Sequence, residues 1–386
     1  MNENVTPLET LAQTGALPGP EPESPPEAYW MWLAVLLGTA NLHAGRLIDR
    51  YGTARAAWEA RDTAEFHALA GPTAVHNLKK GETPAAYLPV LAWCARHSVW
   101  VLPFDDPSFP LALSRIPDPP LVLYCTGDVT VLGLPHTVGM VGARKPTQYG
   151  ASAAAVLGDA LAQSGAVIVS GMADGLDSEA HKAAVRAHAP TVAVLGVPIS
   201  VTYPAANAAL RANIERRGAV ISEYAPGAPC DYHVTFLQRN RIIAALSGAL
   251  VVVEARLKSG TMSTVAHAER YGRPIFAVPG SIFSPLSEGT NTLLREKRAA
   301  AAVEPSDILA AVGLRGAAIA PAEPKPAPEL PETARRVLAC IGARPVGLGM
   351  LCEQTGLPMN TLLTAISRLQ IAGMIAAQPG QKYILK

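Results

Sequence analysis

The chain has 386 residues, which is long enough for two or three domains with at least one sizeable apolar core. Hydrophobic residues make up 49% of it and charged residues 16%, so we expect a globular protein with a rather apolar composition. The first long apolar stretch, residues 30–37, is too short to span a bilayer, and the acidic segment before it lacks the positive flank of a signal peptide. We therefore expect a cytoplasmic protein with no membrane partner.

The cysteines and the distribution of charge indicate which kinds of site and partner to expect. The five cysteines are scattered, with no CxxC pair, so neither a disulfide framework nor a zinc site is indicated, and we expect no metal ion and no cofactor. The net charge of +1 hides an asymmetry, because residues 1–134 hold 8 Lys and Arg against 14 Asp and Glu. Residues 135–315 hold 17 against 13, and residues 331–386 hold 6 against 2. The two basic blocks are compatible with a polyanionic partner.

The N-terminal part of the chain divides into a tail and a helical block. Residues 1–27 are rich in Pro, Glu and Gly and are predicted to be disordered. Residues 28–97 predict short helices separated by glycines, which is typical of a small module of the helix-hairpin-helix or sterile-alpha-motif (SAM) kind. Because this block is acidic, a helical cap without nucleic-acid contact is the favoured interpretation. Residues 98–125 alternate short apolar runs with prolines and predict a connecting strand region.

A repeating pattern begins at His136, where apolar runs rich in β-branched residues alternate with Ala-rich segments of helical length. Runs that are apolar on both faces and joined by helices are typical of a parallel sheet covered on both sides. With right-handed crossovers, they predict an α/β, Rossmann-like, doubly wound domain over residues 98–315. The predicted strands are 137–142, 166–171, 191–196, 218–224, 249–255 and 274–280, and the predicted helices are 147–164, 176–188, 206–217, 236–247 and 261–272.

The C-terminal part predicts a linker and a third domain. Residues 316–331 include five prolines and predict an extended linker. Residues 332–386 predict three helices at helix-turn-helix spacing, with Gly356 in the turn, and then a two-stranded wing turning at Pro379-Gly380. This is the pattern of a winged helix. Two interpretations of it stand side by side: the domain binds single- or double-stranded DNA, or it binds protein or dimerises.

Charged and small residues follow the predicted strands, at the edge where an open doubly wound sheet binds its ligands. Arg144 and Lys145 follow the first strand of the repeat, a Gly-rich turn (171–177) follows the second, and residues 256–261 follow the fifth. Small residues let backbone N–H groups approach an anion, and the helix N-termini behind them favour negative charge. One such loop is the ordinary way to turn a strand into a helix, but three of them together predict an anion pocket.

The segment FLQRNRII is a further candidate for this pocket. Arg239 and Arg241 flank Asn240 where a helix is predicted to begin. Arginine forks bind phosphate through two hydrogen bonds, and Asn can bind a base or cap a helix. The alternative interpretation is ordinary surface charge.

Acid/base chemistry is the other function that these loops could serve. The candidate side chains are Asp174, Asp177, Glu179, His181 and Glu254. The sequence has neither an HExxH metal set nor a GxSxG nucleophile. A helix starting near Ser178 would place Asp177 at its N-cap and His181 in its first turn. We therefore favour structural roles for Asp177 and His181, which hold the turn through bonds to loop amides, and expect no catalytic residue.

Several motifs carry a family resemblance: VGARKPTQYG, VSGMADGLDSEAHKAA, SEY, FLQRNRIIAALSGALVVVEARLKSGTMSTVAHAERYGRPIFAVPG and EGTN. They occur in the order and at about the spacing of the DNA-processing protein DprA (Smf) family, which the chain resembles over about residues 100–300. The resemblance implies a non-catalytic single-stranded DNA (ssDNA) binder of natural transformation, or competence. Such a protein protects incoming ssDNA, loads a RecA-type recombinase onto it for DNA recombination, and forms a homodimer through the Rossmann domain.

The resemblance also implies which residues bind the strand, and where this chain departs from the family. Contacts to ssDNA or its phosphates are expected from Arg144, Lys145, Ser170, Gly171, Gly175, Asp177, Arg239, Asn240, Arg241, Lys258, Ser259 and Gly260. Asp174 stands where the family usually has a basic residue, Ala205 where it usually has Lys, and residues 196–200 replace a GTGLD-like string. Each missing cation is expected to lower the affinity of the pocket for DNA and the salt dependence of that affinity. The basic domain over residues 332–386 is expected to compensate for this loss.

One enzymatic alternative follows from the KSGTMST turn. It is similar to the PGGxGT turn of the lysine-decarboxylase-like nucleotide phosphoribohydrolases, which carry a catalytic Glu four residues past the GT pair. Counted from Gly260-Thr261, this chain has Val265 or Ala266 at that place. The missing carboxylate favours a binding protein over an enzyme.

Overall fold

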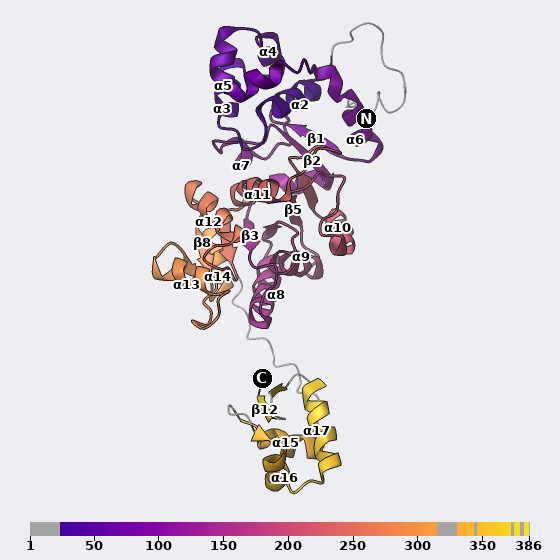
Figure 1. Ribbon diagram of the computed structural model, residues 1–386, viewed down its shortest axis with the longest axis vertical. Coiled ribbons are helices and arrows are strands. Elements are labelled where there is room, and N and C mark those ends of the chain that lie inside the picture. Colours follow the sequence, from indigo (N-terminus) through magenta and orange to yellow (C-terminus); the bar gives the residue numbers. More distant parts are fainter. Residues whose placement is uncertain (1–23, 315–329, 343–345, 372–373, 379–381, 386) are drawn as a thin grey trace. The chain divides into compact units, whose positions relative to one another are not determined.

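The computed structural model describes residues 24–314, 330–342, 346–371, 374–378 and 382–385 (Figure 1). Its contacts divide the chain into two compact units, Met1–Ala318 and Ile319–Lys386, and each is described by itself. Within the described ranges, no helix combines the length and the apolar character that crossing a membrane requires.

The first unit begins with a helical block. Its helices are α2 (Pro26–Leu37), α3 (His43–Tyr51), α4 (Ala54–Glu59), α5 (Ala64–Leu78) and α6 (Leu88–Arg96). α2 starts inside the segment predicted to be disordered, and residues 1–23 of that segment lie outside the described residues. Thr53 and Thr63 accept hydrogen bonds from first-turn amides of α4 and α5 and so cap these helices. Gly71, with φ of +82°, kinks α5.

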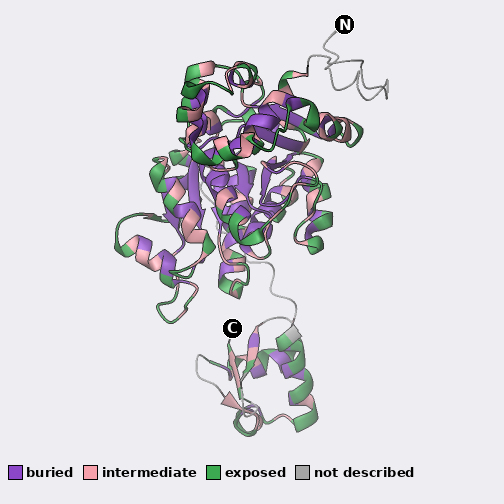
Figure 2. Ribbon diagram, turned by 45° about the horizontal axis from the view of Figure 1, so that its top comes forward, coloured by how far each residue is buried: buried purple, intermediate pink, exposed green. Residues whose placement is uncertain are grey.

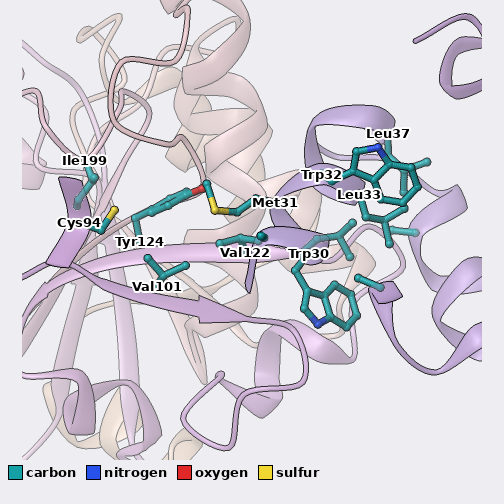
Figure 3. Packing of buried hydrophobic residues seen from close by; sticks show 14 of the residues in the cluster. Trp30, Met31, Trp32, Leu33, Leu37, Cys94, Val101, Val122, Tyr124 and Ile199 are labelled. Carbon is teal, nitrogen blue, oxygen red and sulfur yellow. The ribbon is translucent and has the colours of Figure 1, made fainter. Parts of the chain in front are cut away.

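This helical block shares its apolar core with one edge of the sheet. Strands β1 (Trp100–Pro103) and β2 (Val122–Gly127) form the predicted connecting strand region and pair antiparallel. Trp30 and Met31 of α2 belong to the same buried cluster as Val122 and Tyr124 of β2 (Figure 3). The core is therefore continuous at this point, and a helical domain bounded at residues 28–97 stays a prediction.

A nine-stranded sheet of order β1-β2-β6-β5-β4-β3-β7-β8-β9 forms the centre of the first unit. Its seven later strands are β3 (Thr137–Val141), β4 (Val167–Ser170), β5 (Thr191–Leu195), β6 (Ala219–Ser222), β7 (Ala249–Val252), β8 (Ile275–Ala277) and β9 (Ala300–Ala301). From β6 to β9 all neighbours pair parallel, whereas β2 pairs antiparallel with both β1 and β6. This arrangement confirms the predicted Rossmann-like, doubly wound sheet.

Helices cover the sheet on both faces, which is why its central strands β4 to β7 are buried (Figure 2). The alternation along β4 shows this directly, because successive strand side chains point to opposite faces. Val167 and Val169 lie in one apolar cluster with residues of α11 and α12, and Ile168 between them lies in another with residues of α8 and α9. The helices of this part are α7 (Leu111–Ser114), α8 (Gln148–Gln163), α9 (Leu176–Arg186), α10 (Ala208–Glu215), α11 (Tyr232–Leu246), α12 (Gly260–Arg270), α13 (Glu288–Arg295) and α14 (Pro305–Ala311).

The second unit is a winged helix with a core of its own. It contains α15 (Glu332–Ala339), β10 (Val346–Gly347), α16 (Leu348–Thr355), α17 (Met359–Ile371), β11 (Ile375–Gln378) and β12 (Lys382–Leu385), and its strands pair antiparallel in the order β10-β12-β11. Gly356 ends α16 in the left-handed conformation, with φ of +63°. Val337, Leu351 and Leu369 are buried between the three helices. The predicted turn at Pro379-Gly380 and most of the predicted linker 316–331 lie outside the described residues.

Candidate functional site

A pocket of about 640 Å³ opens at the carboxyl ends of the central parallel strands. The segments that follow β3, β4, β5 and β7 all contribute to its wall, and α11 contributes the rest. Its lining residues are Val141, Gly142, Ala143, Arg144, Ala173, Asp177, Tyr203, Tyr232, His233, Phe236, Leu237, Arg239, Asn240, Ile243, Ser259, Gly260, Thr261 and Thr264. The pocket therefore lies where an open α/β sheet is expected to bind its ligand.

Phe236 lies at the centre of a group of aromatic and cationic side chains on one wall of this pocket. The guanidinium of Arg144 lies 5.1 Å from the centre of its ring, and that of Arg239 lies 5.6 Å from it. Tyr203 and Tyr232 stack on each other with ring centres 5.0 Å apart, and both lie within 5.7 Å of the Phe236 ring. The wall thus offers positive charge and exposed π-faces side by side.

Arg239 is fixed in place by the backbone behind the pocket. Its side chain is only 4% exposed, and its Nη1 donates to the carbonyl oxygens of Gly171, at 2.7 Å, and Val194. Burial lowers the pKa of this guanidinium to about 10, so it still carries its charge at neutral pH. A cation held at this depth supplies a fixed positive charge to the pocket.

The Gly-rich turn between β4 and α9 is organised around Asp177. Burial raises the pKa of its carboxyl, although the charge of Arg239 and hydrogen bonds from the amides of Ala173 and Gly171 oppose this shift. The predicted bonds to loop amides are therefore present. The predicted N-cap is wrong by two positions, because α9 starts at Leu176 and its N-cap is Gly175.

Three of the predicted contact residues shape the wall from behind and do not line the pocket. Ser170 is fully buried and its hydroxyl donates to the carbonyl of Met140 at 2.6 Å. A Cβ on Gly171 would lie 2.6 Å from both Arg239 and Asp177, and Gly175 has φ of +77°. Glycine is required at both positions, by close approach in the first case and by backbone conformation in the second.

The structure corrects the predicted role of Arg241. Its side chain is fully buried, and its Nη2 donates to Glu223 Oε1 at 2.6 Å, while its Nε lies 3.7 Å from Asp118 Oδ2. The hydroxyl of Tyr271 donates to the same Asp118 at 3.1 Å. Arg241 therefore ties α11 to the end of β6 and to the segment before β2, because a buried charge needs opposite charge beside it. It does not reach the pocket.

The other predicted residues fall into two groups. Asn240, Ser259 and Gly260 line the pocket, and Asn240 Nδ2 donates to Ser263 Oγ at 2.8 Å and to the carbonyl of Gly260 at 3.2 Å, which holds α12 against α11. Lys145 and Lys258 are exposed on the neighbouring loops and do not line it. The two positions that depart from the family, Asp174 and Ala205, are likewise exposed and outside the lining.

The remaining acid/base candidates have structural roles. His181 is fully buried, and its Nδ1 bonds to the hydroxyl of Thr191 at 2.8 Å rather than to loop amides, so that part of the prediction is wrong. Glu254 is also buried and accepts hydrogen bonds from the amide and the hydroxyl of Thr147, which caps α8. Glu179 pairs at the surface with the lysine three residues further on. Within the described part of the chain, no group of His, Cys, Asp and Glu is arranged to hold a metal ion.

Sequence reasoning missed the aromatic part of the site. Tyr232 and Phe236 stand four residues apart and therefore on one face of α11, and this spacing was a usable signal. Tyr203 could not be placed from the sequence, because it comes from the segment after β5 and meets α11 only in the folded chain. Thr261 lies in the predicted loop 256–261, whereas His233, which also lines the pocket, carried no sequence signal of its own.

Comparison with known proteins agrees with this geometry. A family model described as DNA recombination-mediator protein A matches residues 100–313, and one described as the DprA winged helix domain matches residues 321–381. Protein Smf of Escherichia coli (strain K12) is 34% identical over 298 residues, which cover 75% of this chain and 78% of that protein.

Two solved structures are also similar to this chain. The X-ray structure of DNA processing protein A (DprA) from Streptococcus pneumoniae has a TM-score of 0.59 at 29% identity, over 73% of this chain and 97% of that one. DNA processing protein A from Helicobacter pylori, solved for its single-stranded DNA binding mode, has a TM-score of 0.50 at 33% identity, over 55% of this chain and 94% of that one.

Proposed function

The chain belongs to the DNA recombination-mediator protein A family, and on that premise we propose that its pocket binds single-stranded DNA with little sequence preference. The proposed setting is DNA processing in natural transformation, where the protein protects incoming strands and loads a RecA-type recombinase onto them. Binding, not catalysis, is the proposed activity, and the proposed working form is a cytoplasmic homodimer. The winged helix is proposed to add contacts to single- or double-stranded DNA.

The observation that carries this proposal is the wall around Phe236. A single strand presents phosphates and unpaired bases in alternation, and proteins that bind it without sequence preference combine cations with aromatic platforms. Arg144 and the buried Arg239 supply cations within 6 Å of the Phe236 ring, and Tyr203 and Tyr232 are partly exposed next to it. The same wall therefore suits a phosphate and the base beside it.

The test is the affinity for a labelled oligo-dT strand at two salt concentrations. Phe236→Ala is expected to weaken binding about tenfold, because a stacked base is worth about 1–3 kcal/mol. Arg144→Ala is expected to weaken it too and to reduce the slope of log K against log salt by about 0.7, the value for one lost phosphate contact on a single strand. Arg46→Ala, which removes an exposed arginine of α3, is the control and is expected to bind as the wild type does.

Two results would contradict the proposal. One is an affinity that neither salt nor the Arg144 and Phe236 substitutions change. The other is release of free base from nucleoside monophosphates by a protein that does not bind oligo-dT, which would instead favour the lysine-decarboxylase-like phosphoribohydrolases.

A further inference from the structure

A second hollow, of about 480 Å³, lies beside the first one on the same edge of the sheet. It is bounded on one side by Thr147 and Tyr149, which follow β3, and on the other by the loop 279–287, which follows β8. We propose that this hollow and the tip of that loop bind a further nucleotide of the strand that occupies the first pocket. The inference rests on the proposed function and extends it to a second subsite.

The loop after β8 is braced at its base and apolar at its tip. Asn291 exchanges two hydrogen bonds with the backbone of Gly280, at 3.0 and 3.1 Å, and two successive turns link Ser281, Ser284 and Ser287. A Cβ on Gly280 would collide with the Ser287 side chain, so the base of the loop is closely packed. The tip residues nevertheless project into solvent.

Those tip residues are Ile282 and Phe283, which are 84% and 90% exposed. Of the large apolar side chains in the described residues they are the two most exposed, and they are neighbours in sequence. Exposed apolar residues that are scattered singly need no explanation, but two together on a braced loop indicate a contact surface.

Tyr149 connects the two sides of this hollow. Its hydroxyl donates to the carbonyl of Pro279 at 2.6 Å, which fixes the ring across the gap between α8 and the loop after β8. The residue is 53% exposed, so much of the ring stays open to solvent. Tyr149 therefore presents aromatic surface to the hollow, and the exposed Phe283 lies at the tip of the loop that forms its other side. Exposed aromatic rings of this kind are what the stacking of bases uses.

Continuity with the first pocket favours nucleic acid as the occupant. Residues 142–149 border both hollows, with Arg144 on the first and Tyr149 on the second. β7 lies between β3 and β8 in the sheet, so the exposed Arg256 and Lys258 that follow it lie between the two hollows. A strand leaving the first pocket would therefore pass a basic ridge before it reaches the second.

The acids near this path are fewer than the cations. Glu254 lines the second hollow, but its side chain is buried and both of its oxygens accept hydrogen bonds from Thr147. Two acids are exposed, Glu288 in the first turn of α13 and Asp174 in the turn beside the first pocket. Against these three stand the exposed Arg144, Lys145, Arg256 and Lys258. The balance of charge suits a polyanion.

The experiment compares oligo-dT of about four nucleotides, which fills the first pocket, with one of about sixteen, which reaches the second. The double variant Ile282→Ser, Phe283→Ser is expected to bind the long strand about tenfold more weakly and the short strand as the wild type does. Leu42→Ser, a change at another exposed apolar residue, is the control and is expected to leave both affinities unchanged. A variant Phe283→Trp provides a direct signal, since its added fluorescence should be quenched by the long strand only.

Each alternative gives a different result. Equal affinity of wild type and double variant for the long strand, or no quenching in Phe283→Trp, would overturn the second subsite. If the double variant binds both strands more weakly by the same factor, the tip belongs to the first pocket. If its sedimentation coefficient without DNA differs from that of the wild type, the tip contacts a second copy of the chain. Either outcome also overturns the second subsite. If the wild type binds neither strand, the proposed function itself fails.

Discussion

Asp174 is the residue whose charge conflicts most directly with the proposed ligand. It is exposed in the turn after β4, next to Ala173, which lines the first pocket. A carboxylate near a phosphate is unfavourable, though water screens it at an exposed position.

Asp174→Arg is therefore expected to tighten binding to oligo-dT by up to about fivefold, which corresponds to about 1 kcal/mol, and to steepen the salt dependence. The measurement is fluorescence anisotropy at two salt concentrations. Asp49→Arg, which makes the same change at an exposed acid of α3, is the control. A tightening of the same size in both variants would mean that only net charge matters and that the turn is not part of the site.

The sequence predicted some of the pocket's charged side chains, but Lys145 and Lys258, which it also predicted, lie outside its lining. The structure brings Arg144, Arg239 and Asn240 to one pocket, as predicted, although their contact with DNA stays a prediction. The role of Arg241 could not be predicted, because its partner Asp118 comes from a remote part of the chain.

His181 makes stability depend on pH. Burial lowers the pKa of its imidazole to about 3, against 6.5 for an ordinary histidine. Between these values the unfolded chain binds more protons than the folded one, so this contribution is complete above about pH 6.5 and is lost as the pH falls towards about 3. Within that window a single group changes the free energy of unfolding by up to about 1.4 kcal/mol per pH unit.

The expected result is a shallower loss of stability in His181→Gln than in the wild type when urea unfolding is followed from about pH 7 to about pH 4. His76→Gln removes an exposed histidine of α5 and is expected to keep the wild-type slope. Carboxyl groups elsewhere contribute equally to the pH dependence of unfolding in all three proteins. Parallel curves for the wild type and His181→Gln would contradict the assignment.

At the scale of elements, the start of α8 is set by the close approach of Gly150 to Glu254. A Cβ on Gly150 would collide with the Glu254 carboxylate, which caps the helix through Thr147. Gly150→Ala is therefore expected to lower the free energy of unfolding by about 1–3 kcal/mol, the range for overpacking.

Replacing glycine by alanine is expected to have the opposite effect on stability at Gly45 of α3, where a Cβ would meet open space. Because alanine is the better helix former, Gly45→Ala is expected to raise the free energy of unfolding by up to about 1 kcal/mol. Urea unfolding of both variants is the measurement. Stabilisation by both would mean that helix propensity outweighs the collision at Gly150.

The sequence pattern predicted the elements of the sheet well because burial on both faces leaves uninterrupted apolar runs. All six predicted strands are present, each within a few residues of its predicted bounds. The antiparallel pairing of β1 and β2 at the edge of the sheet, and the kink of α5 at Gly71, were not predicted. Strand pairing is a non-local property, and a glycine gives no sign in the sequence of whether it ends a helix or bends it.

At the scale of the whole molecule, the basic charge of the second unit is available to a polyanion in addition to the pocket. Residues 331–386 hold six Lys and Arg against two Asp and Glu. Deletion of residues 317–386 is therefore expected to weaken binding to single- or double-stranded DNA markedly, by about tenfold or more at low salt. The described remainder has its own clusters of buried residues, so circular dichroism can verify that it stays folded. Unchanged affinity would contradict a role of the winged helix in DNA binding.

The core that α2 shares with β2 also decides how the protein can be shortened. Trp30 and Met31 cover Val122 and Tyr124, so a fragment that began at residue 98 would expose this apolar surface along the edge of the sheet. Such a fragment would be prone to aggregate during purification. A fragment intended for crystallisation or for ligand screening should therefore keep residues 24–314 together.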